Sequence, residues 1–164
     1  MNNNKNIFLK SELSNQEQDQ ETSKFHIIPV PLEKTVSYGK GTSKGPQSII
    51  YASNELERFT GKSEPCSEGI FTHPKLDCNM PLKDIMSNIG NLTKEVSSKN
   101  KIPITLGGEH SVTYGAVNGI FDGLKLKKRN RNYSNWCSCR FKKKLWKSKI
   151  LTCKRDVPFR KREI

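Results

Sequence analysis

The stretch KIPITLGGEHSVTYGAVNGIF, residues 101–121, contains the clearest change of pattern along this sequence. Its first part, Lys101–Leu106, is a short apolar run of the kind that forms a buried strand. Gly107 and Gly108 end that run, because paired glycines favour a sharp turn. A helical spacing of apolar residues follows from Ser111. The stretch therefore predicts a strand, a tight turn and a helix that leaves the end of the strand.

The same alternation of strand and helix recurs earlier in the chain. The expected strands lie at Phe25–Val30, Ile70–Phe71 and Lys101–Leu106, and the expected helices begin at Pro46, Pro81 and Ser111. Strands that alternate with helices are typical of an α/β fold with a parallel sheet. Ligands of such folds bind at the carboxyl ends of the strands, which is the position of the loop Gly107–Ser111.

Apolar side chains recur at helical spacing in two of the expected helices. After Pro46 these residues are Ile49, Ala52, Ser53, Leu56 and Phe59. In the helix from Pro81 to Ser98 they are Ile85, Ile89, Leu92 and Val96. We expect each set to form one apolar face of its helix. The glycine-rich segment Val36–Gly45 predicts an irregular loop instead.

The net charge of +13 is confined to one end of the chain. Residues 124–164 contain 16 of the 29 basic residues and 2 of the 16 acidic ones, so residues 1–123 are nearly neutral. Both tryptophans and three of the five cysteines lie in the same basic tail. Basic residues interleaved with aromatic ones are one signature of nucleic-acid binding, so the tail first suggests that function.

Targeting signals are not evident in the sequence. The first residues lack the apolar run of a signal peptide, and no stretch approaches the roughly 20 apolar residues of a membrane span. The irregular spacing of the five cysteines predicts no disulfide framework. We therefore expect a cytoplasmic protein without a membrane partner.

The segment TLGGEHS, residues 105–111, carries the most informative polar side chains. His110 lies at the mouth of the expected sheet, and histidine is a common metal ligand through one neutral ring nitrogen. No second ligand is evident nearby in the sequence. The alternative is a solvent-facing loop whose histidine packs against the next helix. These residues alone leave both interpretations open.

Four further reactive side chains are interpreted as structural. We expect His26 to be a packed or edge histidine of the first strand and His73 to lie in a loop. Cys66 and Cys78 are expected to be free thiols.

Two longer segments resemble the ureohydrolases of the arginase family, and most of all the agmatinase branch. They are IPVPLEKTVSYGKGTSKGPQSIIYASNELERF, residues 28–59, and PITLGGEHSVTYGAV, residues 103–117. The resemblance extends over about residues 25–128. It implies a three-layer α/β/α fold with a parallel sheet, of which this chain holds an incomplete part. It also implies a two-manganese centre, whose bridging hydroxide attacks a guanidinium carbon and releases urea.

The resemblance assigns roles by position. His110 matches the family's first metal ligand, and Glu109 would lie beside the metal without binding it. Gly107, Gly108 and Ser111 would complete the loop around that ligand. The implied substrate is a small guanidino compound such as agmatine, which would yield urea and putrescine for polyamine biosynthesis. A homo-oligomer is a further implied possibility.

A second family motif, D-x-H-x-D, should follow His110 at the end of the next strand, and a D-x-D motif should come later. Neither motif is present in this chain. At the place expected for the second motif stands KKRNRNYSNWCSCRFKKKLW, residues 127–146, which has no strand pattern and no carboxylates. The ligands that the resemblance implies are therefore missing from the tail.

A shift of reading frame explains the tail. When each codon is read one nucleotide late, RNRNYSNWCSCRF can become EIEIIVIGAHADL, a strand followed by A-H-A-D. Ser138–Cys139 then stands in place of the histidine and Arg140–Phe141 in place of the aspartate. Trp136 gives a glycine where the motif has its first aspartate. Downstream, ILTCKRDV can become YSHASVM, another string that resembles the family.

We therefore expect three regions and an inactive product. Residues 1–23 would form a flexible arm, residues 24–128 the N-terminal part of a ureohydrolase domain, and residues 129–164 a disordered, out-of-frame tail. The chain would then be a truncated ureohydrolase that does not catalyse the reaction.

Two alternatives remain. The basic tail would bind nucleic acid through its lysines, arginines and aromatic rings, or the chain would be a non-catalytic partner of an intact homologue. We favour the shifted frame, so nucleic acid is not an expected partner.

Overall fold

The structure, a computed structural model, describes residues 6–124. The basic tail of residues 129–164, with its expected disorder, lies outside the described residues. The strands are β1 (Phe25–Val30), β2 (Ile70–Thr72) and β3 (Ile102–Gly107), the helices are α1 (Gly45–Ala52), α2 (Leu82–Ser98) and α3 (Val112–Gly123), and short 3-10 turns lie at Thr42–Lys44, Ser53–Glu55 and Pro65–Glu68. Each predicted strand and helix is therefore present in the described part.

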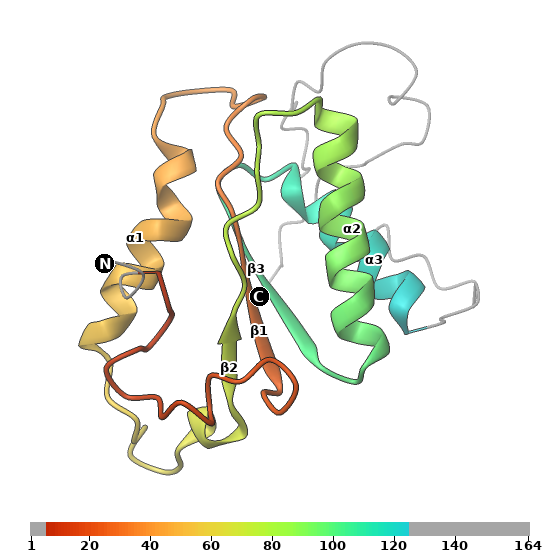
Figure 1. Ribbon diagram of the computed structural model, residues 1–164. Helices are drawn as coiled ribbons and strands as arrows, with labels where there is room; N and C mark the ends of the chain where they lie inside the picture. The colour runs from red at the N-terminus through yellow and green to blue at the C-terminus, as the bar shows by residue number, and fades with distance from the viewer. Residues whose placement is uncertain (1–5, 125–164) are drawn as a thin grey trace, which may run out of the picture. The chain divides into compact units, whose positions relative to one another are not determined.

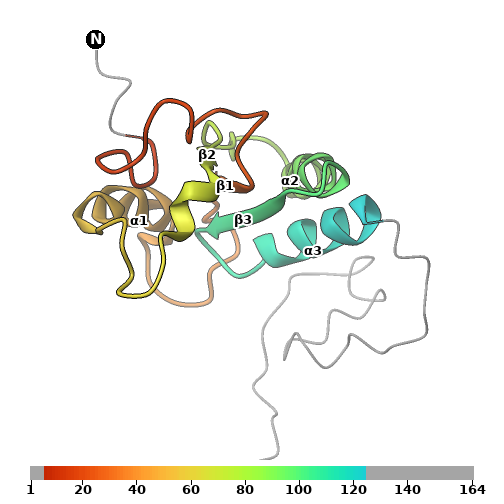
Figure 2. The same ribbon diagram turned by 90° about the horizontal axis from the view of Figure 1, so that it is seen from below.

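The three strands form one parallel sheet in the order β2-β1-β3 (Figure 1). Phe25 pairs with Ile70 on one side and with Ile102 on the other, and Val30 pairs with Gly107 at the far end. Figure 2 shows α1 on one side of the sheet and α2 with α3 on the other. This arrangement confirms the expected α/β fold with helices on both faces of a parallel sheet.

The main core lies between β1 and the helices α2 and α3. Ile28 and Val30 of β1 are fully buried there. They pack in one cluster with Ile85 and Ile89 of α2 and with Val112 of α3. A central parallel strand is covered on both faces, so its sequence is apolar without alternation. The predicted apolar stripe of α2 is confirmed by this cluster.

The predicted apolar face of α1 is wrong. The helix ends at Ala52, a 3-10 turn follows, and Leu56 is already extended. Ile49, Leu56 and Phe59 are 46%, 54% and 57% exposed. The side chains of Ser53 and Asn54 bond to the carbonyl of Ile50, and such local bonds compete with a continuing helix.

Of the residues predicted for the apolar face only Ser53 is buried, and the other buried residues of α1 were not predicted. Pro46, Ile50 and Ser53 are the buried ones. The predicted set of apolar residues followed a 3.6-residue spacing beyond the end of α1 at Ala52, so it identified the wrong face of the helix.

Glycines set the distance between α2 and α3. Gly115, Gly119 and Gly123 recur every four residues, so they share one face of α3. A Cβ atom at Gly119 would lie 2.1 Å from both the carbonyl oxygen of Gly90 and the hydroxyl oxygen of Thr93. Only a residue without a side chain fits at this contact, so the close approach of the two helices depends on glycine.

The N-terminal arm is packed against the domain where the structure describes it, from residue 6 onward. Leu9 and Leu13 are buried in a small cluster with Cys66. The Leu9 amide donates to the Ser53 hydroxyl at 2.8 Å, and the Ile70 amide donates to a carbonyl of the arm at 2.8 Å. Two buried leucines, the neighbouring Phe8 and these hydrogen bonds hold part of the arm against the domain. The expected flexibility of residues 1–23 stays a prediction.

No helix within residues 6–124 combines the length and apolar character that crossing a membrane requires.

Candidate functional site

The carboxyl ends of β1 and β3 lie side by side and bring two loops together. Val30 pairs with Gly107, and the Gly108 amide donates to the Val30 carbonyl at 2.9 Å. A Cβ atom at Gly108 would lie 2.2 Å from the carbonyl oxygen of Leu32. This close approach requires glycine at position 108. The loop after β3 therefore lies directly against the loop after β1.

Glu109 holds these two loops together. Its carboxylate is buried and accepts hydrogen bonds from the backbone amides of Lys34 at 2.8 Å and Thr35 at 2.7 Å. The hydroxyls of Thr35 and Ser111 donate to its other oxygen. Four donors occupy the main acceptor positions of one carboxylate. This geometry supports the interpretation of Glu109 as a residue beside the site and not a metal ligand, which stays a prediction.

Burial and hydrogen bonding act in opposite directions on the pKa of Glu109. Burial raises it, because a charged carboxylate loses hydration. The hydrogen bonds from Ser111, Thr35 and Lys34 lower it and prevail, so the pKa lies below its ordinary value. Glu109 is therefore charged at neutral pH and keeps the two loops joined.

A second carboxylate, Glu33, orders the loop that follows β1. It accepts hydrogen bonds from the Gly41 amide at 2.8 Å, the Ser43 amide at 2.9 Å and the Ser43 hydroxyl at 2.7 Å. Bonds from Ser43 and Gly41 lower the pKa of Glu33 to about 2. Gly41 has a φ of 108°, which favours glycine. The loop is thus irregular, as predicted, and held by an acid that sequence reasoning missed.

The predicted site residues lie together in one loop, and His110 is the one among them that is predicted to bind a metal. Gly107, Gly108, Glu109 and Ser111 surround His110, whose side chain is exposed. Within residues 6–124, no group of three histidine, cysteine, aspartate or glutamate side chains could hold a metal ion. A two-metal centre needs ligands to both ions. The described residues therefore do not fit the two-manganese centre, although His110 stands at the expected edge.

A buried histidine pair was not expected from the sequence. His26 and His73 are 2% and 9% exposed, and Nδ1 of His26 lies 2.9 Å from Nε2 of His73, a hydrogen-bond distance. His73 lies in a loop, as predicted, directly after β2, and its amide donates to the Ile27 carbonyl. Its ring also contacts the edge of Phe71. Only the β1–β2 register brings these residues together, so no local signal could reveal the pair.

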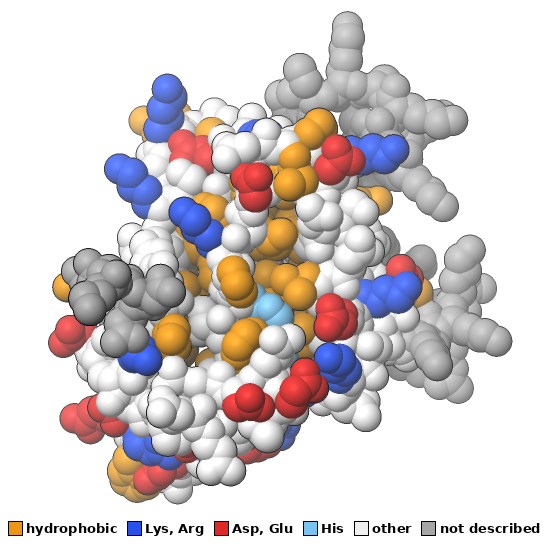
Figure 3. Space-filling view, in the orientation of Figure 1, with side chains coloured by type: hydrophobic (Ala, Val, Ile, Leu, Met, Phe, Trp, Pro, Cys, Tyr) orange, Lys and Arg blue, Asp and Glu red, His pale blue; other side chains and the backbone are white. Residues whose placement is uncertain are grey.

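Both histidines of this pair are held in the neutral form. Burial is the main cause that lowers the pKa of each. The neighbouring His26 lowers the pKa of His73 further, to about 4. Figure 3 shows a histidine beside several apolar side chains on the visible face. The pair is therefore a packing element of β1 and β2, in agreement with the structural interpretation of His26.

Cys66 and Cys78 are free thiols, as predicted.

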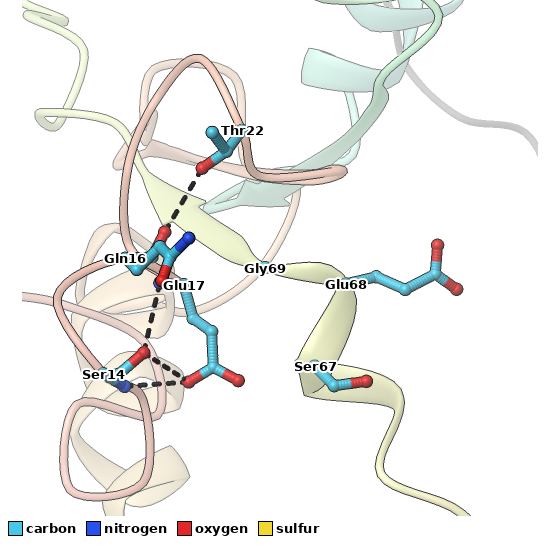
Figure 4. A pocket seen from close by; sticks show the side chains of 7 residues that line it. All are labelled: Ser14, Gln16, Glu17, Thr22, Ser67, Glu68 and Gly69. Atoms are coloured by element: carbon cyan, nitrogen blue, oxygen red, sulfur yellow. Dashed lines mark hydrogen bonds between the residues drawn. The ribbon is translucent and has the colours of Figure 1, made fainter.

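A polar pocket lies at the opposite end of the sheet (Figure 4). Its lining residues precede β1 and β2, and they are Ser14, Gln16, Glu17, Thr22, Ser67, Glu68 and Gly69. Glu17 already accepts bonds from Arg58 and Ser14, which lower its pKa to about 2. Because Glu17 is engaged in holding the arm and Glu68 is paired with Lys24, this pocket is not the candidate site.

Comparison with known proteins agrees with the sequence resemblance. The model of the arginase family matches residues 23–129. An N(1)-aminopropylagmatine ureohydrolase of Synechocystis is 29% identical over 109 residues, which cover 59% of this chain and 34% of that protein. An agmatinase of Bacillus cereus is 30% identical over 111 residues, which cover 66% of this chain and 37% of that protein.

Two solved structures share the fold. The agmatine ureohydrolase of Thermoplasma volcanium superposes with a TM-score of 0.57 at 27% identity, over 67% of this chain and 37% of that one. A putative agmatinase from Clostridium difficile gives a TM-score of 0.58 at 20% identity, over 63% of this chain and 39% of that one, and supports the fold alone.

The chain spans about a third of the length of the curated relatives it matches. The matched region begins with β1 and continues past α3, so it includes the loop that carries His110. The family match covers well over half of the chain, and the fold agrees with it. This chain belongs to the arginase family.

Proposed function

We propose that this chain is the N-terminal part of a metal-dependent ureohydrolase that acts on a guanidino compound such as agmatine. One observation carries the proposal: the loop Gly107–Ser111, fixed by Glu109, presents His110 at the carboxyl edge of a parallel sheet. Ligands of open α/β sheets bind at this edge. The relatives' names, agmatinase and N(1)-aminopropylagmatine ureohydrolase, point to guanidino substrates.

In this proposal the described residues position the site. Glu109 fixes the loop after β3 against the loop after β1, and Glu33 fixes the segment from Gly41 to Ser43. His110 supplies one ligand, and a metal would supply the activated hydroxide. Manganese as the metal, a homo-oligomeric state, a role in polyamine biosynthesis and a cytoplasmic location stay predictions.

We further propose that the written chain does not release urea. Its described residues offer one histidine to a centre that needs ligands for two metal ions, and the sequence contains no D-x-H-x-D motif. The test is a urea assay on the purified 164-residue chain with agmatine, N(1)-aminopropylagmatine and added Mn²⁺. We expect no urea above a blank without protein. Turnover that depends on His110 would contradict the proposal.

A chain translated from the corrected reading frame provides the matched positive control. We propose that residues 129–164 are translated out of frame, with the slip near Lys127–Lys128. Nucleotide sequencing should reveal codons for A-H-A-D, and further on Y-S-H, in the shifted frame. A chain with the corrected frame should release urea, and His110→Ala in that chain should abolish the release. A shifted frame without these strings would refute the proposed origin of the tail.

A further inference from the structure

The segment between β1 and α1, residues 36–44 and called here the rim loop, is anchored at both ends on the loop that follows β3. Just before it, the Thr35 amide donates to Glu109 at 2.7 Å. Just after it, a Cβ atom at Gly45 would lie 3.7 Å from the carbonyl oxygen of Gly107. Figure 1 shows the rim loop crossing from the upper end of β1 to the upper end of α1. The two anchors therefore hold the rim loop at the carboxyl edge of the sheet.

The rim loop is also ordered from within. Glu33 accepts hydrogen bonds from the amides of Gly41 at 2.8 Å and Ser43 at 2.9 Å. Gly39 and Gly41 have φ values of 72° and 108°, which favour glycine. Tyr38 directly precedes Gly39. The bonds to Glu33 and the turn at Gly39 therefore limit the positions that Tyr38 can take.

Tyr38 presents its ring to solvent on this ordered loop. It is 98% exposed, more than any other large hydrophobic residue that the structure describes. The one lysine that lies over an aromatic ring among residues 6–124 is Lys24, over Phe25. The face of an aromatic ring carries negative partial charge and attracts cations. Tyr38 therefore offers a ring face that no cation of the described part covers.

The distance from His110 suits the far end of a guanidino substrate. In the proposed function His110 marks the place of the guanidinium, and Glu109 beside it bonds to Thr35. A chain extends by at most about 3.6 Å per residue, so the Cα atom of Tyr38 lies within roughly 11 Å of that of Thr35. The carboxylates of Glu33 and Glu109 are engaged with backbone amides. A remote cation would therefore meet the ring of Tyr38 more readily than either acid.

We propose that Tyr38 is a specificity-determining residue that receives, on the face of its ring, the cationic end of the substrate remote from the guanidinium. The inference rests on the proposed function and narrows its substrate class to aliphatic guanidines that carry an amine. Lys40 and Lys44, which are exposed on the same loop, would favour a carboxylate at that end instead. Tyr38 and the two lysines therefore predict opposite charges for the remote end.

The first test measures binding to the purified 164-residue chain by saturation-transfer difference NMR. The probes are agmatine and γ-guanidinobutyrate, which share the guanidinium and differ in the remote charge. We expect stronger transfer to agmatine, largest at the methylene beside the amine. Tyr38→Ala should weaken agmatine binding about two- to fivefold, the range of an exposed cation–π contact. Tyr38→Phe keeps the ring face and should bind agmatine like the wild-type chain.

Tyr51 provides the matched control. It is 65% exposed and lies on α1, six positions beyond the contact of Gly45 with β3. Tyr51→Ala should therefore leave agmatine binding unchanged. Equal losses in Tyr51→Ala and Tyr38→Ala would indicate non-specific contact with exposed rings and would overturn the proposal.

The second test uses the frame-corrected chain. Tyr38→Ala should raise KM for agmatine about two- to fivefold and leave kcat unchanged, because the ring holds the remote end equally in the ground state and the transition state. KM for butylguanidine, which has no remote charge, should stay the same. A merely structural role of Tyr38 would change both substrates alike and would contradict the proposal.

The remaining outcomes are also decisive. Equal or stronger transfer to γ-guanidinobutyrate would assign the selection to Lys40 and Lys44 and overturn the role of Tyr38. Absence of transfer to agmatine, or unchanged agmatine binding by Tyr38→Ala, would also refute it. No urea release by the frame-corrected chain would count against the proposed function, while the NMR measurement still tests Tyr38. An active corrected chain whose KM does not depend on Tyr38 would refute only the role of Tyr38.

Discussion

The two faces of the sheet are packed in different ways. On one face, α2 and α3 approach closely enough that Gly119 leaves no space for a Cβ atom. On the other, α1 buries Pro46 and Ile50 while Ile49 and Tyr51 stay 46% and 65% exposed. Packing on the first face depends on the shape of each residue at the contact between α2 and α3. Packing on the second face depends on a few buried apolar residues of α1, and substitutions at its other positions are tolerated.

The largest effect is expected at the contact of α2 with α3. Gly119→Ala would place a Cβ atom against the backbone of Gly90, which cannot move aside like a flexible side chain. We expect the free energy of unfolding to fall by about 3 kcal/mol, as for overpacked cores. Urea denaturation followed by circular dichroism measures this change. Asn118→Ala, at the exposed neighbouring position, should change the unfolding free energy by less than about 0.5 kcal/mol.

The second prediction concerns the anchors of α1. Ile50 is 1% exposed and Ile49 is 46% exposed, although the two side chains are identical and adjacent. Ile50→Ala should lower the unfolding free energy by about 2 kcal/mol or more, and Ile49→Ala by less than about 1 kcal/mol. Chemical denaturation of the two variants side by side measures the difference. Equal losses would mean that α1 is rotated relative to the structure described.

The third prediction concerns the histidine pair, whose effect on stability depends on pH. His73 has an ordinary pKa of 6.5 that folding lowers to about 4, mainly through burial and then through His26. The folded chain thus binds fewer protons than the unfolded chain between these values, so stability falls as pH drops from 6.5 to 4. His73→Gln keeps a polar partner for His26 but does not titrate. The variant should lose less stability over this window.

The measurement of stability against pH needs a control, because other charged groups also contribute. Lys101 also opposes protonation of His73, whereas Glu95 favours it. Glu33, whose pKa is lowered to about 2 by bonds from Ser43 and Gly41, contributes stability that is lost only below pH 4.5. Glu33→Gln should therefore leave the slope above pH 4.5 unchanged. A shallower slope in that variant would mean that the two windows are not separate.

The buried face of α2 could be predicted from the sequence and that of α1 could not, and the reason is physical. The stripe Ile85, Ile89 and Val96 lies within one long helix, so its period reports the buried face directly. The stripe after Pro46 crossed the end of α1 at Ala52. A 3-10 turn follows there and the backbone is extended at Leu56, so the helical period no longer reports a buried face.

The polar contacts were the least predictable features. Glu109 accepts hydrogen bonds from Thr35 and Lys34, which lie 74 and 75 positions earlier in the chain. His26 and His73, which form a hydrogen bond, are 47 positions apart. A local sequence pattern gives no information about hydrogen-bond partners that lie so far apart in the chain. The loop Gly107–Ser111 was predictable because its glycines and polar residues are contiguous in the sequence.

The hydrogen bonds from Lys34 and Thr35 to Glu109 have a consequence for synthesis on the ribosome. The loop after β1 emerges early, yet the carboxylate that fixes it is added 75 residues after Lys34. β1 itself pairs with β2 and β3, which are both made later. Contacts between distant residues form only after the intervening chain is closed into a loop. In a nascent chain β1 therefore lacks β2 until synthesis reaches Thr72, and the loop after β1 is fixed only when the chain has passed Glu109.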